Sequence, residues 1–259
     1  MSKTMSRPKL AVLLSLLVLG ACGGSGEGTP AAPAAPAAKA EGVYGGTITG
    51  GSSPAFQLLI LENDEYWAMY GVSAGNTFLV EGFVQGTGAS NNGNFTSGDA
   101  RDFGFAPATA GTVNATYDAG AHTISGTLGS ATAGTASFSG GAIAGSLYNY
   151  DAGPALATVT GNWVLMDLAG ASLSVAIAPS GSFTASSAGC SMSGTLTPRA
   201  SGKNVFNLSL TFGGAPCLLP GQTATGIALA YPLANGSMQL LVAAHALSRT
   251  QGMAAFGTR

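Results

Sequence analysis

The two histidines, His122 and His245, are the side chains best suited to act as a general base. Hydrolysis by a serine or cysteine nucleophile needs such a base and a third group to orient it. The sequence contains no G-x-S-x-G, H-E-x-x-H, Walker or EF-hand pattern around either histidine. His122 shares a predicted strand face with Ile124 and Leu128, and His245 ends a predicted apolar strand near 238–245. We therefore expect structural histidines, no catalytic residues, no metal site, no cofactor and no enzymatic activity.

The densest group of charges lies in the segment "LENDEYW" at residues 61–67. It consists of Glu62, Asp64 and Glu65, followed by the aromatic residues Tyr66 and Trp67. Carboxylates beside aromatic rings can bind a cation or a sugar, so these five residues are a candidate binding site. The alternative is a hairpin turn at positions 63–64, with solvated carboxylates and aromatic side chains that alternate between core and surface.

The N-terminus has the pattern of a secretory signal. Lys3, Arg7 and Lys9 precede an apolar run over residues 11–20 that contains no charge. This run is shorter than the roughly 20 apolar residues that a membrane-spanning helix requires. We expect residues 1–21 to be an export signal that is removed.

Leu19, Gly20 and Ala21 before Cys22 resemble the lipobox of bacterial lipoproteins. In that family the cysteine receives a diacylglycerol, a peptidase cuts before it, and its new amino group is acylated. The resemblance implies that Cys22 anchors the protein to a membrane through lipid, although Gly20 departs from the usual Ala or Ser. Gly23 stands where the enterobacterial signal for inner-membrane retention has Asp, which favours the outer membrane of a Gram-negative bacterium. The alternative is ordinary secretion, which leaves Cys22 as a free thiol.

The segment 22–41 is expected to be a disordered tether between the lipid and the folded protein. It has no large apolar side chain before residue 41 and therefore cannot bury enough surface to offset its loss of entropy. Pro30, Pro33 and Pro36 exclude a regular helix and favour an extended chain.

The charge balance argues against nucleic acid as a partner. After residues 1–21 are removed, six basic residues face eleven acidic ones, which gives a formal charge of minus five. Charged residues make up only 8% of the chain, against about 25% in typical domains. No basic patch can therefore form on the scale that a phosphate backbone needs.

Once Cys22 is assigned to lipid, Cys190 and Cys217 remain. Two cysteines in an exported protein are expected to form a disulfide. The competing hypothesis is a catalytic or metal-binding thiol, but neither residue lies in a C-x-x-C motif or beside a histidine.

From residue 42 onward the apolar residues alternate with polar ones, as in the segments "GTVNATYD", "ASLSVAIA" and "NVFNLSLTF". A period of two is typical of antiparallel strands with one face buried. Asn92-Gly93 and Asn235-Gly236 predict hairpin turns. The charged stretch around Asp99, Arg101 and Asp102 is expected to be a polar loop. The chain is predicted to be all-β, with two small β-barrel or β-sandwich subdomains.

The predicted subdomains span residues 42–148 and 149–259. Each opens with a glycine two residues before an aromatic residue, in "GVYGG" and "GNWVL", and each contains the tetrapeptide S-G-T-L. These similarities suggest a duplication. Chance is the alternative, because such strings are common in glycine-rich β proteins.

The sequence Gly161-Asn162-Trp163 resembles the G-x-W motif that opens the first strand of lipocalins and other calycin barrels. In those barrels the tryptophan closes one end beneath an arginine from the last strand. The resemblance implies a barrel in the second half, with Arg249 or Arg259 as the arginine.

These observations lead to three hypotheses of function. The first is a cell-envelope lipoprotein that presents a non-catalytic binding or structural module, with the membrane as its partner through lipid. The second is a surface-exposed lipoprotein that binds a host or nutrient protein, because "GFVQGTGASNNGNF" is similar to segments of two-barrel lipoproteins that capture transferrin or complement factors. The third, an envelope hydrolase, is disfavoured by the lack of a catalytic motif.

Overall fold

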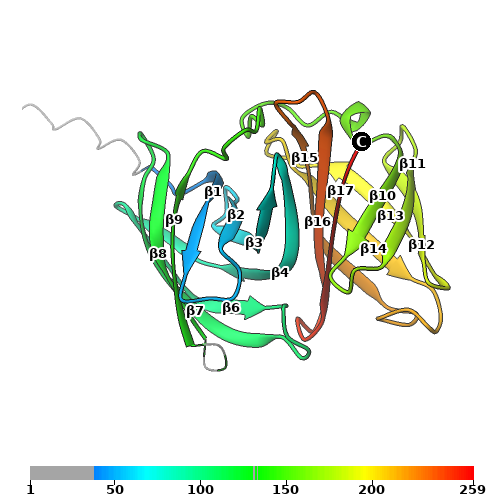
Figure 1. Cartoon of the computed structure of the whole chain (residues 1–259), viewed down its shortest axis with the longest axis horizontal. Helices are drawn as coiled ribbons and strands as arrows, with labels where there is room; N and C mark the ends of the chain where they lie inside the picture. Colours follow the sequence, from blue (N-terminus) through cyan, green and yellow to red (C-terminus); the bar gives the residue numbers. More distant parts are fainter. Residues whose placement is uncertain (1–37, 131, 133) are drawn as a thin grey trace, which may run out of the picture. The chain divides into compact units, whose positions relative to one another are not determined.

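The computed structural model describes residues 38–130, 132 and 134–259 (Figure 1). The predicted signal 1–21, Cys22 and the predicted tether up to residue 37 lie outside these residues. Residues 38–41 were also predicted as disordered tether, but they pack against the first barrel, where Ala38 and Ala40 are hydrogen-bonded. The described chain is all-β, with strands β1 to β17 and one short 3-10 helix, η1. It folds as one compact unit that contains two closed antiparallel barrels. The predicted fold class is confirmed, and both subdomains are barrels rather than sandwiches.

The first barrel is an up-and-down meander in which each strand pairs with its neighbour in sequence, except that β4 pairs with β6 rather than with β5. Its strands are β1 (Gly42–Thr49), β2 (Ala55–Ile60), β3 (Glu65–Ala74), β4 (Thr77–Thr87), β5 (Ala89–Asn91), β6 (Asn94–Asp102), β7 (Thr109–Asp118), β8 (Thr123–Ser130) and β9 (Gly134–Gly141). β1 pairs with β9, and β4 pairs with β6 through Val84 opposite Asp102. The ring of eight strands closes there, and short β5 extends the edge beside β6.

The second barrel repeats this plan. Its elements are η1 (Leu156–Thr158), β10 (Gly161–Asp167), β11 (Ser172–Ile177), β12 (Ser182–Ser187), β13 (Cys190–Pro198), β14 (Phe206–Phe212), β15 (Thr223–Pro232), β16 (Met238–Ala246) and β17 (Gly252–Thr258). β10 and β17 close the barrel with Met166 opposite Phe256 and Asp167 opposite Ala255. The expected boundary between residues 148 and 149 falls in the connection from β9 to η1.

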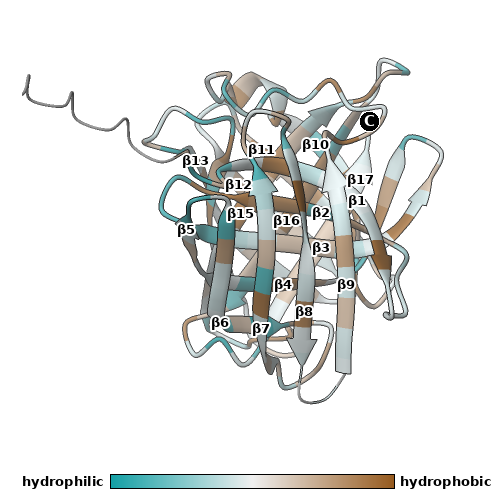
Figure 2. Ribbon diagram, turned by 90° about the vertical axis from the view of Figure 1, so that its left-hand side faces the viewer, coloured by the Kyte–Doolittle hydropathy of each residue, from teal (hydrophilic) through white to brown (hydrophobic). Residues whose placement is uncertain are grey.

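The alternation read from the sequence matches the burial of the strands. In β11 every second residue is buried and the residues between are exposed, and β7 shows the same alternation with its first two inward positions half-buried. The same alternation produces the mixed colouring of the strands in Figure 2, where apolar and polar residues follow each other along β6 to β9. Apolar side chains fill the second barrel, including Trp163, Phe183, Phe206, Leu208 and Phe212.

Two sequence predictions about local structure are wrong. Asp99, Arg101 and Asp102 belong to strand β6 rather than to a loop. The pairing of β6 with β7 shifts register between Ser97 and Ala100, and this bulge breaks the alternation on which the prediction relied. The sequence pattern also predicts a strand over residues 157–166, but this strand, β10, begins only at Gly161, because η1 precedes it.

The two Asn-Gly sequences form different turns. Asn92 and Gly93 both have positive φ, of 47° and 81°, as a type I′ hairpin requires. In the second turn only Gly236 has positive φ, of 85°. There Asn235 accepts a hydrogen bond from the backbone of Ser237 with its own side chain, which favours a different turn geometry.

The positions of the strands support a duplication of the two barrels only in part. Each barrel opens with a glycine of positive φ, Gly42 at 147° and Gly161 at 114°. The S-G-T-L tetrapeptides, however, lie in β8 and β13, which hold different positions in their barrels. Their similarity therefore reflects ordinary strand composition rather than matching places in two copies.

A third apolar cluster joins the barrels. The outer faces of β15, β16 and β17 contribute Leu229, Tyr231, Leu241, Ala243 and Phe256, and the first barrel contributes Trp67, Met69, Phe78 and Phe83. In β15 and β16 both faces are consequently buried, one in the barrel and one against its neighbour. Within the described chain, no helix is long and apolar enough to cross a bilayer.

Candidate functional site

The carboxylates of the predicted acidic and aromatic cluster hold the first barrel to its surroundings. Glu62 is paired with Arg199 of the second barrel, with two Nε contacts of 3.0 Å. Burial raises the pKa of Glu62, but the hydrogen bonds and charge of Arg199 outweigh it and keep the pKa below its ordinary value. Asp64 lies 3.5 Å from Lys39 and accepts a hydrogen bond from Ser90. The carboxylates of Glu62 and Asp64 therefore belong to two separate ion pairs.

The aromatic members of the cluster point in opposite directions. Tyr66 faces the interior of the first barrel and donates to the hydroxyl of Ser97, and burial raises its pKa to about 12. Trp67 faces outward into the cluster between the barrels, where its Nε1 donates to Glu65 at 2.9 Å. Both rings are 2% exposed. The structure therefore does not bring these residues together on one accessible surface.

His245 is held at the junction of the barrels. Its ring stacks on Trp67 at 5.4 Å and on Phe103 at 5.7 Å, and its Nδ1 lies 2.9 Å from the carbonyl oxygen of Ala246. Burial lowers its pKa below the ordinary value. The ring is consequently a packing element between two aromatic side chains.

His122 lies in the turn before β8, with a positive φ of 51°, and not on the strand where the sequence placed it. Its Nε2 donates to the carbonyl oxygen of Val43 at 2.8 Å, and its ring stacks on Tyr44 at 4.5 Å. These contacts close one end of the first barrel.

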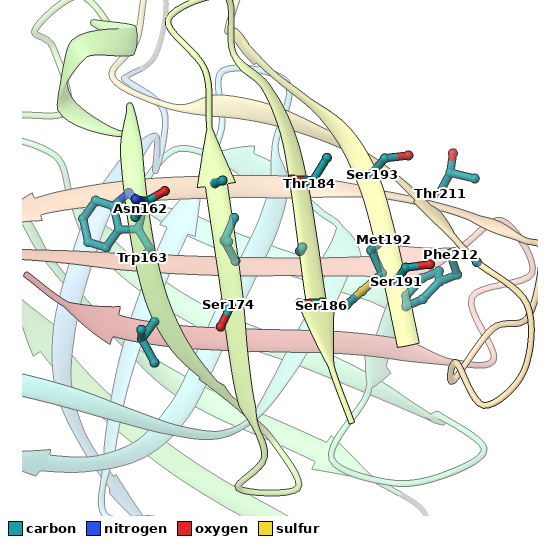
Figure 3. A pocket seen from close by; sticks show the side chains of 15 residues that line it. Asn162, Trp163, Ser174, Thr184, Ser186, Ser191, Met192, Ser193, Thr211 and Phe212 are labelled. Carbon is teal, nitrogen blue, oxygen red and sulfur yellow. The ribbon is translucent and has the colours of Figure 1, made fainter. Parts of the chain in front are cut away.

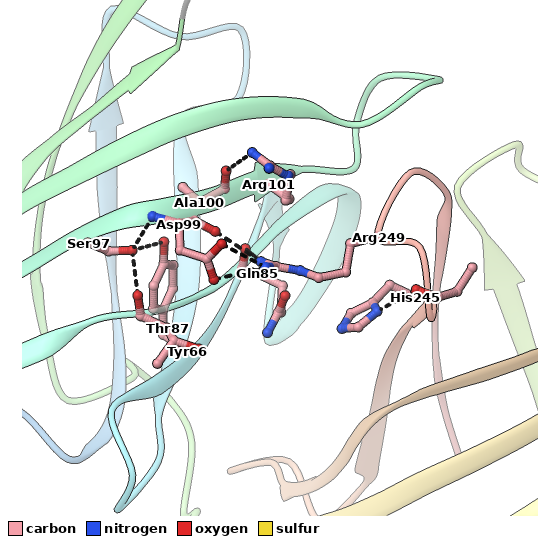
Figure 4. Close-up of polar contacts among 10 residues, drawn as sticks. Tyr66, Gln85, Thr87, Ser97, Asp99, Ala100, Arg101, His245 and Arg249 are labelled. Atoms are coloured by element: carbon pink, nitrogen blue, oxygen red, sulfur yellow. Dashed lines mark hydrogen bonds and ion pairs between the residues drawn. The ribbon is translucent and has the colours of Figure 1, made fainter.

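A polar node lies beside His245 where the β16–β17 turn meets the first barrel (Figure 4). Arg249 donates to both carboxylate oxygens of Asp99 at 2.8 Å, and to the backbone oxygens of Asp99 and Gln85. Asp99 is presented by the bulge of β6, next to the Ser97 hydroxyl that bonds Tyr66. The node therefore connects the second barrel to the interior hydrogen bonds of the first.

The predicted disulfide between Cys190 and Cys217 is confirmed. It joins the start of β13 to the connection between β14 and β15. Both cysteines are buried, so the bond fixes this long connection against the end of the second barrel.

Of the two arginines expected to cover Trp163, the structure selects Arg259. Its guanidinium carbon lies 4.0 Å from the centre of the Trp163 ring, and it donates to the backbone oxygens of Thr158 and Thr160. Arg249 lies in the polar node instead. The guanidinium of Arg259 thus covers Trp163 at this end of the second barrel and bonds the carbonyl oxygens at the end of η1.

The chain enters the first barrel at a fixed point. Tyr117 donates to the carbonyl oxygen of Ala38 at 2.6 Å, and Tyr44 donates to that of Ala40 at 2.9 Å. Ala40 is completely buried, and its N–H bonds Ser90. The segment that leads out of the fold is therefore secured against the end of the barrel that His122 closes.

Two exposed apolar side chains lie at the other end, while Leu147, Val164, Met166 and Leu218 are exposed elsewhere. Phe105, in the β6–β7 loop, is 41% exposed, and Leu247, in the β16–β17 turn, is 94% exposed. The loop and the turn are joined by the hydrogen bond from Ala108 to Thr250, and Figure 1 shows both at its lower edge. β7 separates this end from Ala38, and its ten residues span about 30 Å.

A groove of about 810 Å³ runs over the outer face of β10 to β14 (Figure 3). Hydroxyl side chains line it, among them Ser174, Thr184, Ser186, Ser191, Ser193 and Thr211. These hydroxyls can donate and accept hydrogen bonds, but nothing else in the groove points to a ligand. We assign it no role.

A cleft of about 490 Å³ lies between the barrels, on the outer side of β1 and β2. Two glutamines border it. Gln239 binds the backbone of Phe78 with both atoms of its amide, whereas Gln57 has a buried Oε1 without a hydrogen-bond partner. Sequence reasoning missed both residues. The available signal was a glutamine inside an otherwise apolar strand.

Among the described residues, no group of three or more His, Cys, Asp or Glu side chains is arranged to hold a metal ion. Comparisons with protein-family models, curated proteins and solved structures found no match for this chain.

Proposed function

We propose that this protein is a lipid-anchored protein of the cell envelope that presents a non-catalytic two-barrel binding module. Cys22 is the lipidated residue, residues 22–37 form the tether, since Ala38 and Ala40 are bonded to the first barrel, and the outer membrane of a Gram-negative bacterium is the site. The lipobox-like sequence before Cys22 supports the anchor.

The observation that carries the proposal is the asymmetry of the fold. Ala38 and Ala40 are bonded at one end of the first barrel, and exposed Phe105 and Leu247 lie at the other. A tether attached at the first end leaves the exposed apolar loops at the opposite end of the barrel from the attachment point. This arrangement supports a module whose exposed loops contact a partner protein.

The surroundings of the histidines support a role without catalysis. The ring of His122 is engaged by Tyr44 and Val43, and that of His245 by Trp67 and Phe103. A general base must reach a nucleophile or a water molecule, and each of these rings instead serves the packing of a barrel end or junction.

Substitution of Cys22 tests the anchor. Cys22→Ser should abolish metabolic labelling with palmitate and move the protein from the membrane fraction to the soluble fraction, because no thiol remains to accept the diacylglycerol. Ser25→Ala, three residues along the tether, should label and fractionate as the unchanged protein does. Membrane association that survives Cys22→Ser would refute the anchor.

Capture of a host or nutrient protein is the second candidate, favoured by the exposed apolar loops. Single exposed apolar residues are ordinary, but Phe105 and Leu247 lie on two loops joined by a hydrogen bond and can contribute to one contact surface. Protease added to intact cells should then digest the barrels, with an inner-membrane protein as the protected control. Complete protection until the outer membrane is permeabilised would restrict the module to periplasmic partners.

A further inference from the structure

We propose that the second barrel binds an uncharged, mainly apolar small molecule at the end opposite Trp163. This inference rests on the proposed binding function and gives it a site and a class of ligand. The site is a cup of about 450 Å³ where the β10–β11 and β12–β13 turns meet the connection from β14 to β15. Small-molecule sites typically enclose about 300–1,000 Å³, and the mouth of a β-barrel is one of their usual places. The larger apolar residues that line the cup are Leu168, Leu173, Met192, Phe212, Leu218 and Met253.

The two ends of the second barrel are built differently. At one end the guanidinium of Arg259 covers the ring of Trp163. At the cup, apolar side chains stay accessible instead, because Leu218 is 55% exposed and Leu168 and Met253 are half-buried. Apolar surface inside a concave site is available to contact a ligand.

The cup continues beside an unpaired stretch of the barrel wall. β10 and β17 pair through two residues each, and the last of these pairs joins Asp167 to Ala255. In the described chain, residues 252–254 at the start of β17 pair with β16 alone. Met253, which packs on the barrel interior, and Ala254, which belongs to the cluster between the barrels, both line the cup here. The cup is therefore reached from the side of the barrel as well as from its end.

Two methionines lie between the cup and the interior of the barrel. Met192, Met253 and Leu173 border both the cup and an apolar cavity of about 40 Å³ deeper in the barrel. All the described residues that line this deeper cavity are apolar. Methionine is unbranched and adapts its conformation readily, so Met192 and Met253 can move to admit an apolar chain. The apolar part of a ligand should therefore point inward between them.

The charge of the lining discriminates among apolar ligands. Among the described residues that line the cup, only Asp167 carries a charge. Its Oδ1 accepts hydrogen bonds from the N–H groups of Ala169 and Ala171, at 2.9 and 2.8 Å, and these bonds hold the carboxylate beside the β10–β11 turn. A fixed negative charge repels an anionic ligand. A neutral alcohol or ester should therefore bind better than a fatty acid with the same chain.

The test is a fluorescence titration of the mature chain, residues 22–259, that carries Cys22→Ser and so contains no lipid. The probe is N-phenyl-1-naphthylamine, an uncharged apolar dye whose emission rises in an apolar site. We expect saturable binding with a dissociation constant on the order of 0.1 mM, as the usual affinity per atom gives for a ligand of this size. Decanol should displace the dye at neutral pH, and decanoate should need a concentration about tenfold higher, because Asp167 repels it.

Asp167→Asn tests the discrimination by charge. The variant keeps an oxygen that can accept from Ala169 and Ala171, but it removes the negative charge. The difference between decanol and decanoate should therefore become smaller. Equal displacement by the two compounds in the unchanged protein would overturn the class of ligand that we propose.

Ala171→Trp tests the location. It should weaken binding of the dye at least about tenfold, because the indole would occupy the cup that Ala171 lines. Ala176→Trp is the matched control, since Ala176 is exposed on β11 and lies outside the cup, and it should leave the titration unchanged. Leu218→Glu is a second variant at an exposed position, where folding does not depend on the side chain. It should weaken binding as well, because it places a charge in the apolar lining.

The melting temperature of each variant shows whether it is folded. If Ala171→Trp does not fold, Leu218→Glu decides the location. The absence of saturable binding, or binding that is unchanged in the folded variants, would overturn the proposal. The titration contains no membrane, so its failure leaves the anchor test at Cys22 unaffected.

Discussion

Single polar side chains in this protein are placed where they complete a barrel end or the junction between barrels. His245 separates Trp67 from Phe103, and Arg259 covers Trp163. Each polar group meets an aromatic face, so its contribution depends on both charge and packing. Two predictions follow from this dependence at the scale of the residue.

The first prediction concerns how the free energy of unfolding changes in acid. Because burial lowers the pKa of His245 in the folded protein, the unfolded chain takes up its proton first as the pH falls through the ordinary value of 6.5. The free energy of unfolding should therefore decrease from about pH 6.5 downward, until the folded histidine is protonated too. The slope cannot exceed about 1.4 kcal/mol per pH unit for one group. Urea unfolding followed by tryptophan fluorescence measures it, since Trp67 adjoins the ring.

His245→Phe should remove this part of the pH dependence, because it keeps an aromatic ring without a proton to gain. The contribution of Glu62 is separate. Its pKa is lowered by Arg199, so its stabilisation is present above its ordinary value of 4.5 and is lost as the pH falls through its folded pKa. An unchanged slope between pH 6.5 and 5 in His245→Phe would exclude His245 as the source.

The second concerns the cation above Trp163. Arg259→Ala should lower the free energy of unfolding by about 1–2 kcal/mol, because it removes a cation–π contact and two hydrogen bonds at a solvent-exposed position. Arg259→Lys should recover part of the loss. Arg101→Ala is the control, since the guanidinium of Arg101 makes one long hydrogen bond of 3.4 Å. Equal effects of the two alanine variants would contradict a special role for Arg259.

At the scale of the element, strands are well determined by local sequence, whereas long connections need a covalent or polar support. The connection between β14 and β15 contains three glycines and two prolines between residues 213 and 221, and the disulfide from Cys217 to Cys190 holds it. The bulge of β6 has polar support instead of a covalent bond. The N–H of Asp99 donates to the hydroxyl of Ser97, and the carbonyl oxygen of Asp99 accepts from Arg249.

Removal of the disulfide should destabilise the second barrel. Cys190→Ala with Cys217→Ala should lower the free energy of unfolding by about 3–4 kcal/mol, as the chain-entropy model gives for a separation of 27 residues. Chemical unfolding in the Cys22→Ser background measures the loss. Reduction of the unchanged disulfide should produce a similar decrease. Free alkylatable thiols at both positions before reduction would contradict the bond in the exported protein.

At the scale of the whole molecule, two filled barrels share a third apolar cluster. Strands β15 and β16 are buried on both faces, so the second barrel cannot separate without exposing Leu229, Tyr231 and Leu241. Polar links also join the two barrels, among them Glu62 to Arg199, Asp99 to Arg249, and Phe78 to Gln239. We expect the barrels to unfold together.

Gln239→Leu tests the buried link. It should lower the free energy of unfolding by about 2–4 kcal/mol, because the N–H and C=O of Phe78 would remain buried without partners. Gln222→Leu, at an exposed glutamine, should change it by less than about 0.5 kcal/mol. A loss of similar size in both variants would contradict a supporting role for Gln239.

The sequence by itself determined the all-β class, most of the strands, the division into two halves and the pairing of the cysteines. Alternation with a period of two depends on which side of a strand faces the core, and that property is local. The G-x-W motif likewise anticipated an arginine over Trp163, and left two arginines as candidates.

Tertiary structure decided what the polar residues do. The carboxylates and rings of residues 62–67 are adjacent in sequence, yet they separate because successive side chains of a strand face opposite sides. Gln57 and Gln239 are 182 positions apart and border one cleft only because the barrels pack together. Closure of each barrel and the packing of one on the other depend on contacts between distant residues, which no local pattern encodes.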